Sequence, residues 1–369
     1  METGNSLLTE MGAILKILIT GNLGYVGPAV IQRLRKSFPG ATLIGLDMGY
    51  FANCLTVAEM VSRHQVDVQY FADVRNPPEE VLQDVDAIVY LAAISNDPMG
   101  ALFEGVTEKV NHHAAYDLAI KAKSRGVKSF VFASSCSVYG FAEGARTEDS
   151  PLNPLTAYAK SKVGGEKDLS SLADARFTVT CLRFATACGM SERLRLDLVL
   201  NDFVASALVN GEIVILSDGT PWRPLIHIKD MAKAIEWGIE RDGQHGGNAL
   251  SINIGSNQWN YQVKDLAEAV AQAIPGTKIS INEGAQPDRR SYQVSFEQFM
   301  KLAPDFQPSM DLTTAIAELK DGMQAINFKN KDFRNSQLIR LNMLKRLKTA
   351  GMITENLEWV VQDGNLVEA

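Results

Sequence analysis

The sequence has few cysteines and histidines, and neither type has the spacing of a metal site. Its 369 residues include four cysteines, at positions 54, 136, 181 and 188, and five histidines. No two cysteines stand in the C-x-x-C spacing of zinc and redox sites, and no two histidines lie four residues apart. We therefore expect no bound metal, no disulfide framework and a reducing, cytoplasmic setting.

Long apolar runs and a basic stripe are also missing. No apolar run approaches the ~20 residues that cross a bilayer, so we expect no contact with a membrane. The net charge is −7, and basic residues are not interleaved with aromatic ones, which argues against a nucleic-acid partner. Residues 1–13 lack the basic and apolar regions of a secretion signal, which predicts a short N-terminal extension.

The sequence does contain short apolar runs that alternate with helical stretches. Runs buried on both faces and separated by helices are typical of a parallel sheet with helices on both sides. This pattern predicts an α/β fold, a doubly wound parallel sheet (Rossmann) with a smaller C-terminal substrate-binding lobe. The expected strands are residues 15–20, 42–47, 67–71, 87–92, 129–133 and 178–184.

One glycine-rich turn points to a dinucleotide. Gly21, Gly24 and Gly27 follow the first apolar run and precede a helical stretch, so the helix N-terminus offers unpaired N–H groups to a pyrophosphate. Asp47 ends the next apolar run, where a carboxylate accepts both ribose hydroxyls and repels a 2′-phosphate. The pattern predicts an NAD site; an ordinary strand-turn-helix is the alternative.

A second motif places a tyrosine and a lysine on one helix face. Tyr158 and Lys162 are four residues apart, which brings their side chains together on a helix. A fixed ammonium lowers the pKa of a neighbouring phenol, and a phenol with a pKa nearer neutrality is a better proton acceptor. We therefore expect Lys162 to lower the pKa of Tyr158.

Together these motifs resemble the extended short-chain dehydrogenase/reductase family, in its branch of NAD-dependent nucleotide-sugar epimerases and dehydratases. The resemblance spans residues 16–306 and rests on the glycine turn, Asp47, residues 73–74 and 91–93, the segment SSCSVYG at 134–140, YAKSK at 158–162 and LRFATACG at 182–189. It implies NAD as cofactor, a nucleoside-diphosphate sugar as substrate and a homodimer.

The resemblance and the strand ends assign residues to three roles. Ser135, Tyr158 and Lys162 are the expected catalytic residues. The expected cofactor contacts are Gly21, Asn22, Leu23, Gly24, Tyr25, Val26, Gly27, Asp47, Met48, Asp73, Val74, Leu91, Ala92, Ala93, Asn111, Tyr158, Lys162 and Ala185. The expected substrate contacts are Asn96, Asp97, Ser135, Cys136, Ser137, Tyr158, Thr186, Arg193, Arg195, Asn201, Arg223, Asp288 and Arg289. For residues 95–99 the alternative is an ordinary turn, and for residues 193–202 it is a solvated loop followed by the start of a helix.

Two departures from the family pattern bear on the reaction. Cys136 and Ser137 stand where sugar 4,6-dehydratases have Asp and Glu, and neither supplies the pair of carboxyl groups. Thr186 stands where epimerases commonly have Asn. We expect an epimerase that oxidises the sugar transiently, at C4. The alternatives are a dehydrogenase or reductase, a dehydratase with other acids, and a non-catalytic NAD-binding sensor or scaffold.

The alternation of short apolar runs with helical stretches ends at about residue 185, which predicts a domain boundary. Segments 189–196, 217–224 and 284–292 are rich in Gly, Pro, Arg and Asp. We predict an NAD-binding domain at 14–185 with return segments near 226–256, a substrate lobe mainly at 186–328, and a helical tail at 329–369. Within the tail, residues 329–348 are basic and periodically apolar. They predict a helix packed on the body, or alternatively a subunit contact or lid.

Overall fold

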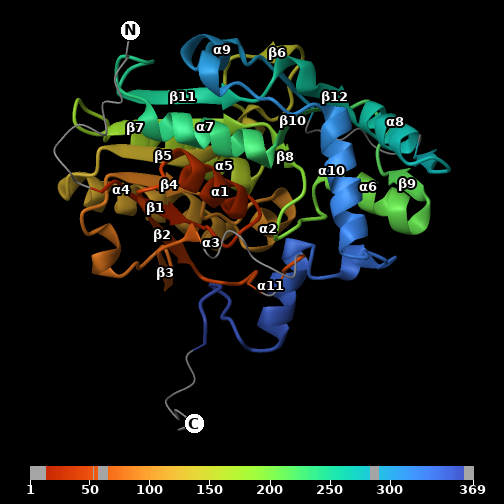
Figure 1. Ribbon diagram of the computed structural model, residues 1–369, viewed down its shortest axis with the longest axis horizontal. Coiled ribbons are helices and arrows are strands. Elements are labelled where there is room, and N and C mark those ends of the chain that lie inside the picture. Colours follow the sequence, from red (N-terminus) through yellow and green to blue (C-terminus); the bar gives the residue numbers. More distant parts are fainter. Residues whose placement is uncertain (1–13, 53, 57–64, 283–290, 361–369) are drawn as a thin grey trace.

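The computed structural model describes residues 14–52, 54–56, 65–282 and 291–360 of the chain (Figure 1). Within these residues seven parallel strands form one sheet, in the order β11-β7-β5-β4-β1-β2-β3. The strands are β1 (Lys16–Thr20), β2 (Thr42–Asp47), β3 (Val68–Phe71), β4 (Ala87–Tyr90), β5 (Ser129–Ser135), β7 (Thr178–Phe184) and β11 (Ala249–Ile254). This sheet confirms the predicted α/β fold class.

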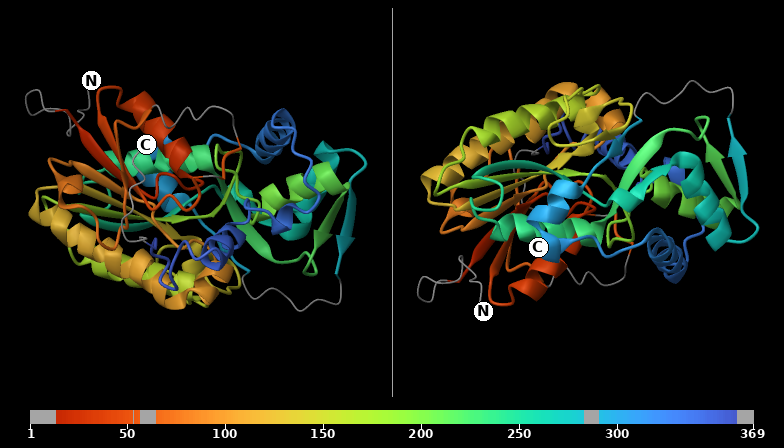
Figure 2. Two further views of the ribbon diagram at one scale, coloured as in Figure 1. Left: turned by 90° about the horizontal axis from the view of Figure 1, so that it is seen from below. Right: turned by 90° about the horizontal axis from the view of Figure 1, so that it is seen from above.

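Helices cover both faces of the sheet, as Figure 2 shows. Helices α1 (Gly27–Ser37) and α7 (Ile228–Glu240) lie on one face, and α4 (Ala114–Ser124) and α5 (Ala157–Ser170) on the other. In β1, Ile17 and Ile19 pack in the core with Ile31 of α1, whereas Leu18 packs in a second core with Leu118 of α4. Because both faces are buried, the strands appear in the sequence as continuous apolar runs.

The remaining described elements build a smaller lobe and several connections. Parallel β8 and β10, with β12 antiparallel to β10, form one small sheet, while β9 pairs with β13 and β6 with β14. These strands are β6 (Ala145–Arg146), β8 (Thr186–Cys188), β9 (Glu212–Ile215), β10 (Trp222–His227), β12 (Asn260–Gln262), β13 (Lys278–Ile281) and β14 (Gln293–Val294). The helices are α2 (Asp97–Leu102), α3 (Glu104–Glu108), α6 (Val199–Asn210), α8 (Val263–Ala273), α9 (Glu297–Leu302), α10 (Leu312–Ala325) and α11 (Arg340–Thr349).

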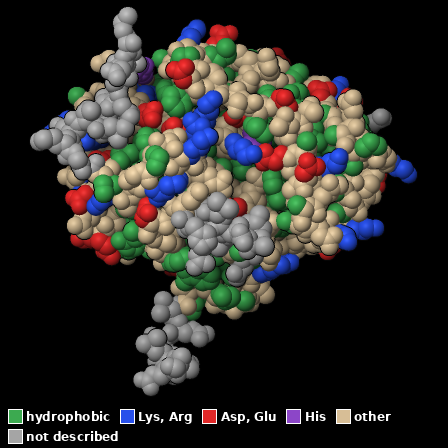
Figure 3. All heavy atoms as spheres, viewed as in Figure 1, with side chains coloured by type: hydrophobic (Ala, Val, Ile, Leu, Met, Phe, Trp, Pro, Cys, Tyr) green, Lys and Arg blue, Asp and Glu red, His purple; other side chains and the backbone are tan. Residues whose placement is uncertain are grey.

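Of the segments expected to return to the main sheet, β11 joins its edge and α7 covers one face, but β10 pairs with β8 instead. In the tail, α11 packs on the body through Met343, Leu344 and Leu347. No helix in the described ranges is both long and apolar enough to cross a bilayer. On the face drawn in Figure 3, acidic and basic side chains are interspersed rather than gathered in one stripe.

The turn between β1 and α1 requires glycine because backbones approach closely there. Gly21 has φ +70°, and a Cβ added to it would lie 2.6 Å from the Ala92 nitrogen at the end of β4. A Cβ on Gly27, the first residue of α1, would lie 2.0 Å from the Asn22 carbonyl oxygen. Gly27 therefore lets α1 pack tightly against the turn.

Gly27→Ala should lower the free energy of unfolding by about 1–3 kcal/mol, because the backbone of the turn must move to admit the methyl group. The matched control is Gly40→Ala, at an exposed position where an added Cβ meets nothing within 4 Å. We expect the control to change stability by less than ~0.5 kcal/mol. Urea unfolding followed by circular dichroism measures both; equal effects would contradict the close-packing argument.

Candidate active site

A cavity of about 800 Å³ lies at the carboxyl ends of the central strands and extends under the smaller lobe. Its wall includes residues that follow β1, β2, β4 and β5, together with parts of β8, β9 and β10. The sheet order reverses between β1 and β4, so the loops that leave these strands diverge and open a crevice. The size and place of the cavity are those of a site for a large organic ligand.

The glycine turn forms one end of this cavity. Gly21, Gly24, Tyr25, Val26 and Gly27 line it. Helix α1 has no side-chain cap and no acidic residue in its first turn, so its N-terminal N–H groups are left for an anion.

Asp47 lines the cavity next to the glycine turn, and its side chain also stabilises the turn. Its carboxylate accepts hydrogen bonds from the Leu23 nitrogen (3.0 Å) and the Gly49 nitrogen (2.7 Å). Burial raises the pKa of Asp47, although both N–H donors oppose this effect. The Asn22 side chain instead donates to Gln69 (2.7 Å), so Asn22 and Leu23 support the turn from behind rather than line the cavity.

The predicted cofactor contacts beyond the turn lie along the same wall, with one exception. Met48, Asp73, Val74, Leu91, Ala92, Ala93 and Ala185 all line the cavity. Asn111 is fully buried behind it. Its side chain accepts from the Ile94 nitrogen (2.8 Å) and donates to the Ile94 oxygen (3.0 Å) and the Ser161 hydroxyl (3.1 Å). Asn111 thus fixes the loop after β4 against α5 rather than contacting a ligand.

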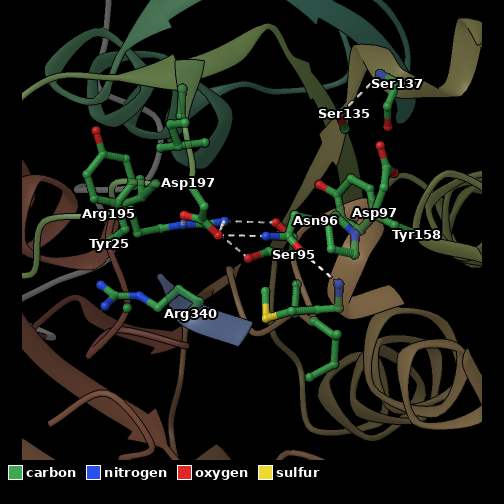
Figure 4. A pocket seen from close by; sticks show the side chains of 18 of the residues that line it. Tyr25, Ser95, Asn96, Asp97, Ser135, Ser137, Tyr158, Arg195, Asp197 and Arg340 are labelled. Carbon is green, nitrogen blue, oxygen red and sulfur yellow. Dashed lines mark hydrogen bonds and ion pairs between the residues drawn. The ribbon is translucent and has the colours of Figure 1, made fainter. Parts of the chain in front are cut away.

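The structure brings Ser135, Tyr158 and Lys162 together on the cavity wall (Figure 4 labels Ser135 and Tyr158). The Ser135 side chain, at the end of β5, lies close enough to Tyr158 to lower the pKa of its phenol, and it accepts a hydrogen bond from the Ser137 nitrogen (3.2 Å). Lys162 Nζ lies 5.7 Å from the centroid of the Tyr158 ring and 4.6 Å from that of Phe132. Helix α5 begins at Ala157, capped by the Thr156 hydroxyl, so Tyr158 sits in its first turn.

The expected effect of Lys162 on Tyr158 is not found in the protein alone. Burial raises the pKa of Tyr158 to about 12, with the hydrogen bond from Ser135 opposing it. Burial also lowers the pKa of Lys162 to about 7, so the lysine is only partly charged at neutral pH. The prediction from spacing was wrong here because it left out the cost of removing both groups from water.

The sequence patterns did not identify one buried residue near the site. Glu166 lies one turn after Lys162 on α5 and forms an ion pair with Arg183 of β7 (Oε2 to Nη2, 2.7 Å). It also accepts a hydrogen bond from Ser134, the neighbour of Ser135. Glu166 therefore joins the helix that bears Tyr158 to the strand that bears Ser135. The spacing of Tyr158, Lys162 and Glu166, four residues each, was the signal for it.

Several predicted substrate contacts line the other end of the cavity. These are Asn96, Asp97, Ser137, Thr186, Arg195 and Arg223. The Asp97 carboxylate faces the Tyr158 region (Figure 4) and raises the pKa of Tyr158 as a secondary effect after burial. The Ser137 hydroxyl oxygen is buried, with no hydrogen-bond partner among the described residues. A hydroxyl in that position is suited to a polar ligand.

Arg195 differs from the expectation of an open phosphate-binding residue. Its guanidinium forms an ion pair with Asp197 (2.8 Å) and donates to the Ser95 hydroxyl (2.9 Å). Asp197 in turn accepts from the Asn96 side chain (2.7 Å), as the dashed lines in Figure 4 show. The charge of Arg195 is therefore already compensated inside the wall.

Three predicted substrate contacts do not line the cavity. The Asn201 side chain is buried and bonded to the Gly189 nitrogen, the Tyr25 hydroxyl and the Arg195 oxygen. The Cys136 thiol donates to the Arg183 oxygen (3.1 Å), and burial raises its pKa, which makes it a poor nucleophile. Arg193 is buried beside the cavity. Asp288 and Arg289 lie outside the described residues.

A group of potential metal ligands lies elsewhere. Ligand atoms of Glu108, His112 and His113 all lie within 4.8 Å of one another, outside the cavity. His112 is bonded to Asp168 (Nε2 to Oδ2, 2.6 Å), and Glu108 and His113 are exposed.

Comparison with known proteins agrees with the fold and the motifs. The sequence model described as "NAD dependent epimerase/dehydratase family" matches residues 17–255. The chain belongs to this family. It is 27% identical over 312 residues to a dTDP-glucose 4,6-dehydratase of Streptomyces griseus, covering 82% of this chain and 92% of that protein. It is 27% identical over 276 residues to a UDP-glucose 4-epimerase of Corynebacterium glutamicum, covering 69% of this chain and 79% of that protein.

Solved structures share the fold of this family member. A UDP-glucuronic acid 4-epimerase from Bacillus cereus, solved with UDP-glucuronic acid and NAD, superposes with a TM-score of 0.70 at 22% identity. The match covers 85% of this chain and all of that one. The chain is therefore an enzyme of a family in which epimerases and dehydratases share one architecture.

Lys162→Met should stabilise the protein most at low pH. The pKa of Lys162 is about 7 in the folded protein against an ordinary 10.5, so between these values the unfolded chain binds more protons, and wild-type stability rises with pH. The gain from the substitution should be largest below pH 7 and shrink by about 1.4 kcal/mol per pH unit toward pH 10. Urea unfolding of both proteins at several pH values measures it; a gain that does not vary with pH would exclude a charged, buried lysine.

Proposed function

We propose that this enzyme is an NAD-dependent epimerase of a nucleoside-diphosphate sugar, acting through transient oxidation at C4. The main support is that one cavity joins the glycine turn, Asp47, Ser135 and Tyr158. A dinucleotide that extends from the turn toward Tyr158 would bring its reactive end next to a proton acceptor. Positioning two reactants in this way accounts for much of the rate in such enzymes.

The residues present fit NAD. The uncapped N-terminus of α1 would hold the pyrophosphate through N–H groups and the helix dipole. Asp47 would accept the hydroxyls of the adenosine ribose, and its negative charge disfavours a 2′-phosphate. When bound, NAD takes up a hydride from the sugar carbon and returns it.

Tyr158 is the proposed proton acceptor. Oxidation of a sugar alcohol to a ketone breaks one O–H and one C–H bond; the phenolate form of Tyr158 would accept the proton, and the hydride would pass to the bound NAD. Ser135 would hold the reacting oxygen, since its hydroxyl already faces that of Tyr158. Lys162 would hold the nicotinamide ribose and, when protonated, favour the phenolate. Reversal on the opposite face of the ketone returns the proton from Tyr158 and gives the epimer.

The nucleotide of the substrate would lie toward the smaller lobe. Arg223, on β10, lines that end of the cavity, and a guanidinium fork matches a diphosphate. The Bacillus cereus structure, whose fold this chain shares, holds both UDP-glucuronic acid and NAD. The homodimer remains a prediction that sedimentation velocity tests.

A dehydratase is the second candidate, supported by one observation. The Asp97 carboxylate lies close enough to Tyr158 to raise its pKa, and Thr156 donates to it (2.7 Å). It offers a carboxyl group near the reacting carbon in place of the absent Asp-Glu pair. The epimerase remains preferred, because dehydration needs both an acid and a base. Cys136 supplies neither, since its thiol donates to the Arg183 oxygen rather than lining the cavity.

Product analysis separates the candidates. The purified protein with NAD is incubated with a panel of UDP-, dTDP-, GDP- and ADP-sugars, and each product is analysed by mass spectrometry and NMR. An isomer of unchanged mass without lasting NADH supports the epimerase. Loss of one water supports the dehydratase, whereas lasting NADH with a sugar two hydrogens lighter identifies a dehydrogenase.

Tyr158→Phe tests the assigned proton acceptor. Removal of the hydroxyl should lower kcat by about 10²–10⁴-fold, because the proton then has no acceptor, while NAD affinity stays within about threefold. The matched control is Tyr116→Phe on α4, which lies outside the cavity and should keep full activity. A Tyr158→Phe variant with normal turnover would contradict this role, and wild-type protein that binds NAD but turns over no sugar would favour a sensor.

A further inference from the structure

The C-terminal segment, residues 340–360, forms part of the cavity wall. Arg340 and Leu344 of α11 and Leu357 after it line the cavity. The match to the family ends at residue 255, so this part of the wall lies outside the region that defines the family. Helix α11 also shares a hydrophobic cluster with Met99 of α2 and with Phe103.

This segment is held against the loop that follows Asp47. The Tyr50 hydroxyl donates to the Leu357 oxygen, and the Trp359 indole donates to the Met48 oxygen (2.7 Å). The rings of Tyr50 and Trp359 lie 5.5 Å apart. The C-terminal segment therefore covers the end of the cavity where the proposed NAD site has its adenosine half, rather than the end near Tyr158.

Arg340 is the unusual residue of this wall. Its side chain is 1% exposed, and its guanidinium carbon lies 4.7 Å from the centroid of the Phe51 ring. One amino group, Nη2, donates to the Arg193 oxygen (2.7 Å). The other, Nη1, is buried and has no hydrogen-bond partner in the part of the chain that the structure describes. Within that part, no carboxylate lies at ion-pair distance from Arg340 either.

This placement is costly for a cation on its own. A buried charge without a partner destabilises a protein strongly, and Arg340 is also the first residue of α11, where the helix dipole is positive. Burial lowers the pKa of Arg340 only to about 10, so the guanidinium remains charged at neutral pH. A bound anion would remove both costs, because it would pair with the guanidinium and face the positive end of the helix.

We propose that Arg340 binds the pyrophosphate of NAD through Nη1, together with the N-terminal N–H groups of α1. Figure 4 shows the Arg340 guanidinium on the same side of the cavity as Tyr25 of the glycine turn, away from Asp97 and Tyr158. Arg195, the other labelled arginine, is already paired with Asp197. The inference rests on the proposed NAD site, and it assigns to the C-terminal segment a residue that contacts the cofactor.

Titration calorimetry with NAD, ADP-ribose, adenosine and UDP tests this role. Arg340→Gln should weaken NAD and ADP-ribose by about 10- to 100-fold, the usual effect of losing a hydrogen bond between charged groups. Adenosine lacks the pyrophosphate, so its affinity should stay unchanged. Arg340→Lys keeps the charge without the planar fork and should show a smaller loss. The matched control, Lys345→Gln, removes an exposed cation from the same helix and should change nothing.

Each other outcome has a separate meaning. Wild-type protein that binds neither NAD nor ADP-ribose would overturn the proposed NAD site itself. Equal loss of adenosine and NAD in Arg340→Gln would make Arg340 a packing residue, and a loss confined to UDP would place it on the substrate; either result overturns the inference. Thermal melting without nucleotide checks folding. If Arg340→Gln is unfolded, Arg340→Lys takes its place in the test. A ratio of NAD affinity to adenosine affinity equal to that of the wild-type protein would then overturn the inference.

Discussion

The buried ion pair between Glu166 and Arg183 is the interaction on which the site depends. It joins α5 to β7 across the sheet, and Ser134 of β5 donates to the same carboxylate. Because Tyr158 and Lys162 lie two turns and one turn before Glu166, this pair sets the register of the helix against β5. A helix displaced by one turn would separate Tyr158 from Ser135. It would also leave buried charges unpaired, which proteins tolerate poorly.

Around this anchor, the cavity combines local and distant parts of the chain. The carboxyl ends of β1, β2, β4 and β5 provide one wall, as expected where a parallel sheet reverses its strand order. The other walls come from the smaller lobe and from residues 340–360, and the contact between Tyr50 and Leu357 spans most of the chain. Buried charged groups line this cavity. Their electrostatic fields act more strongly there than they would in water.

Much of the fold and part of the site could be predicted because their causes are local. Apolar runs that alternate with helical stretches predicted a parallel sheet with helices on both faces, and glycine spacing predicted the turn before α1. Tyr158 and Lys162 share a helix face simply because they are four residues apart. Asp47 and Ser135 reach the cavity because each ends a strand, and the carboxyl ends of parallel strands meet at one edge.

Side-chain direction and environment could not be predicted in the same way. Cys136 and Asn201 stand at positions that face the substrate by analogy, yet each side chain is turned to an internal partner. The pKa of Tyr158 depends on how deeply it is buried, which the spacing to Lys162 does not show. Thus the sequence by itself determined the alternation of strands and helices, the glycine turn and the residue types available for proton transfer. Only the tertiary structure decided that Glu166 pairs with Arg183 and that Arg340 lines the cavity, because these contacts join residues that are far apart along the chain.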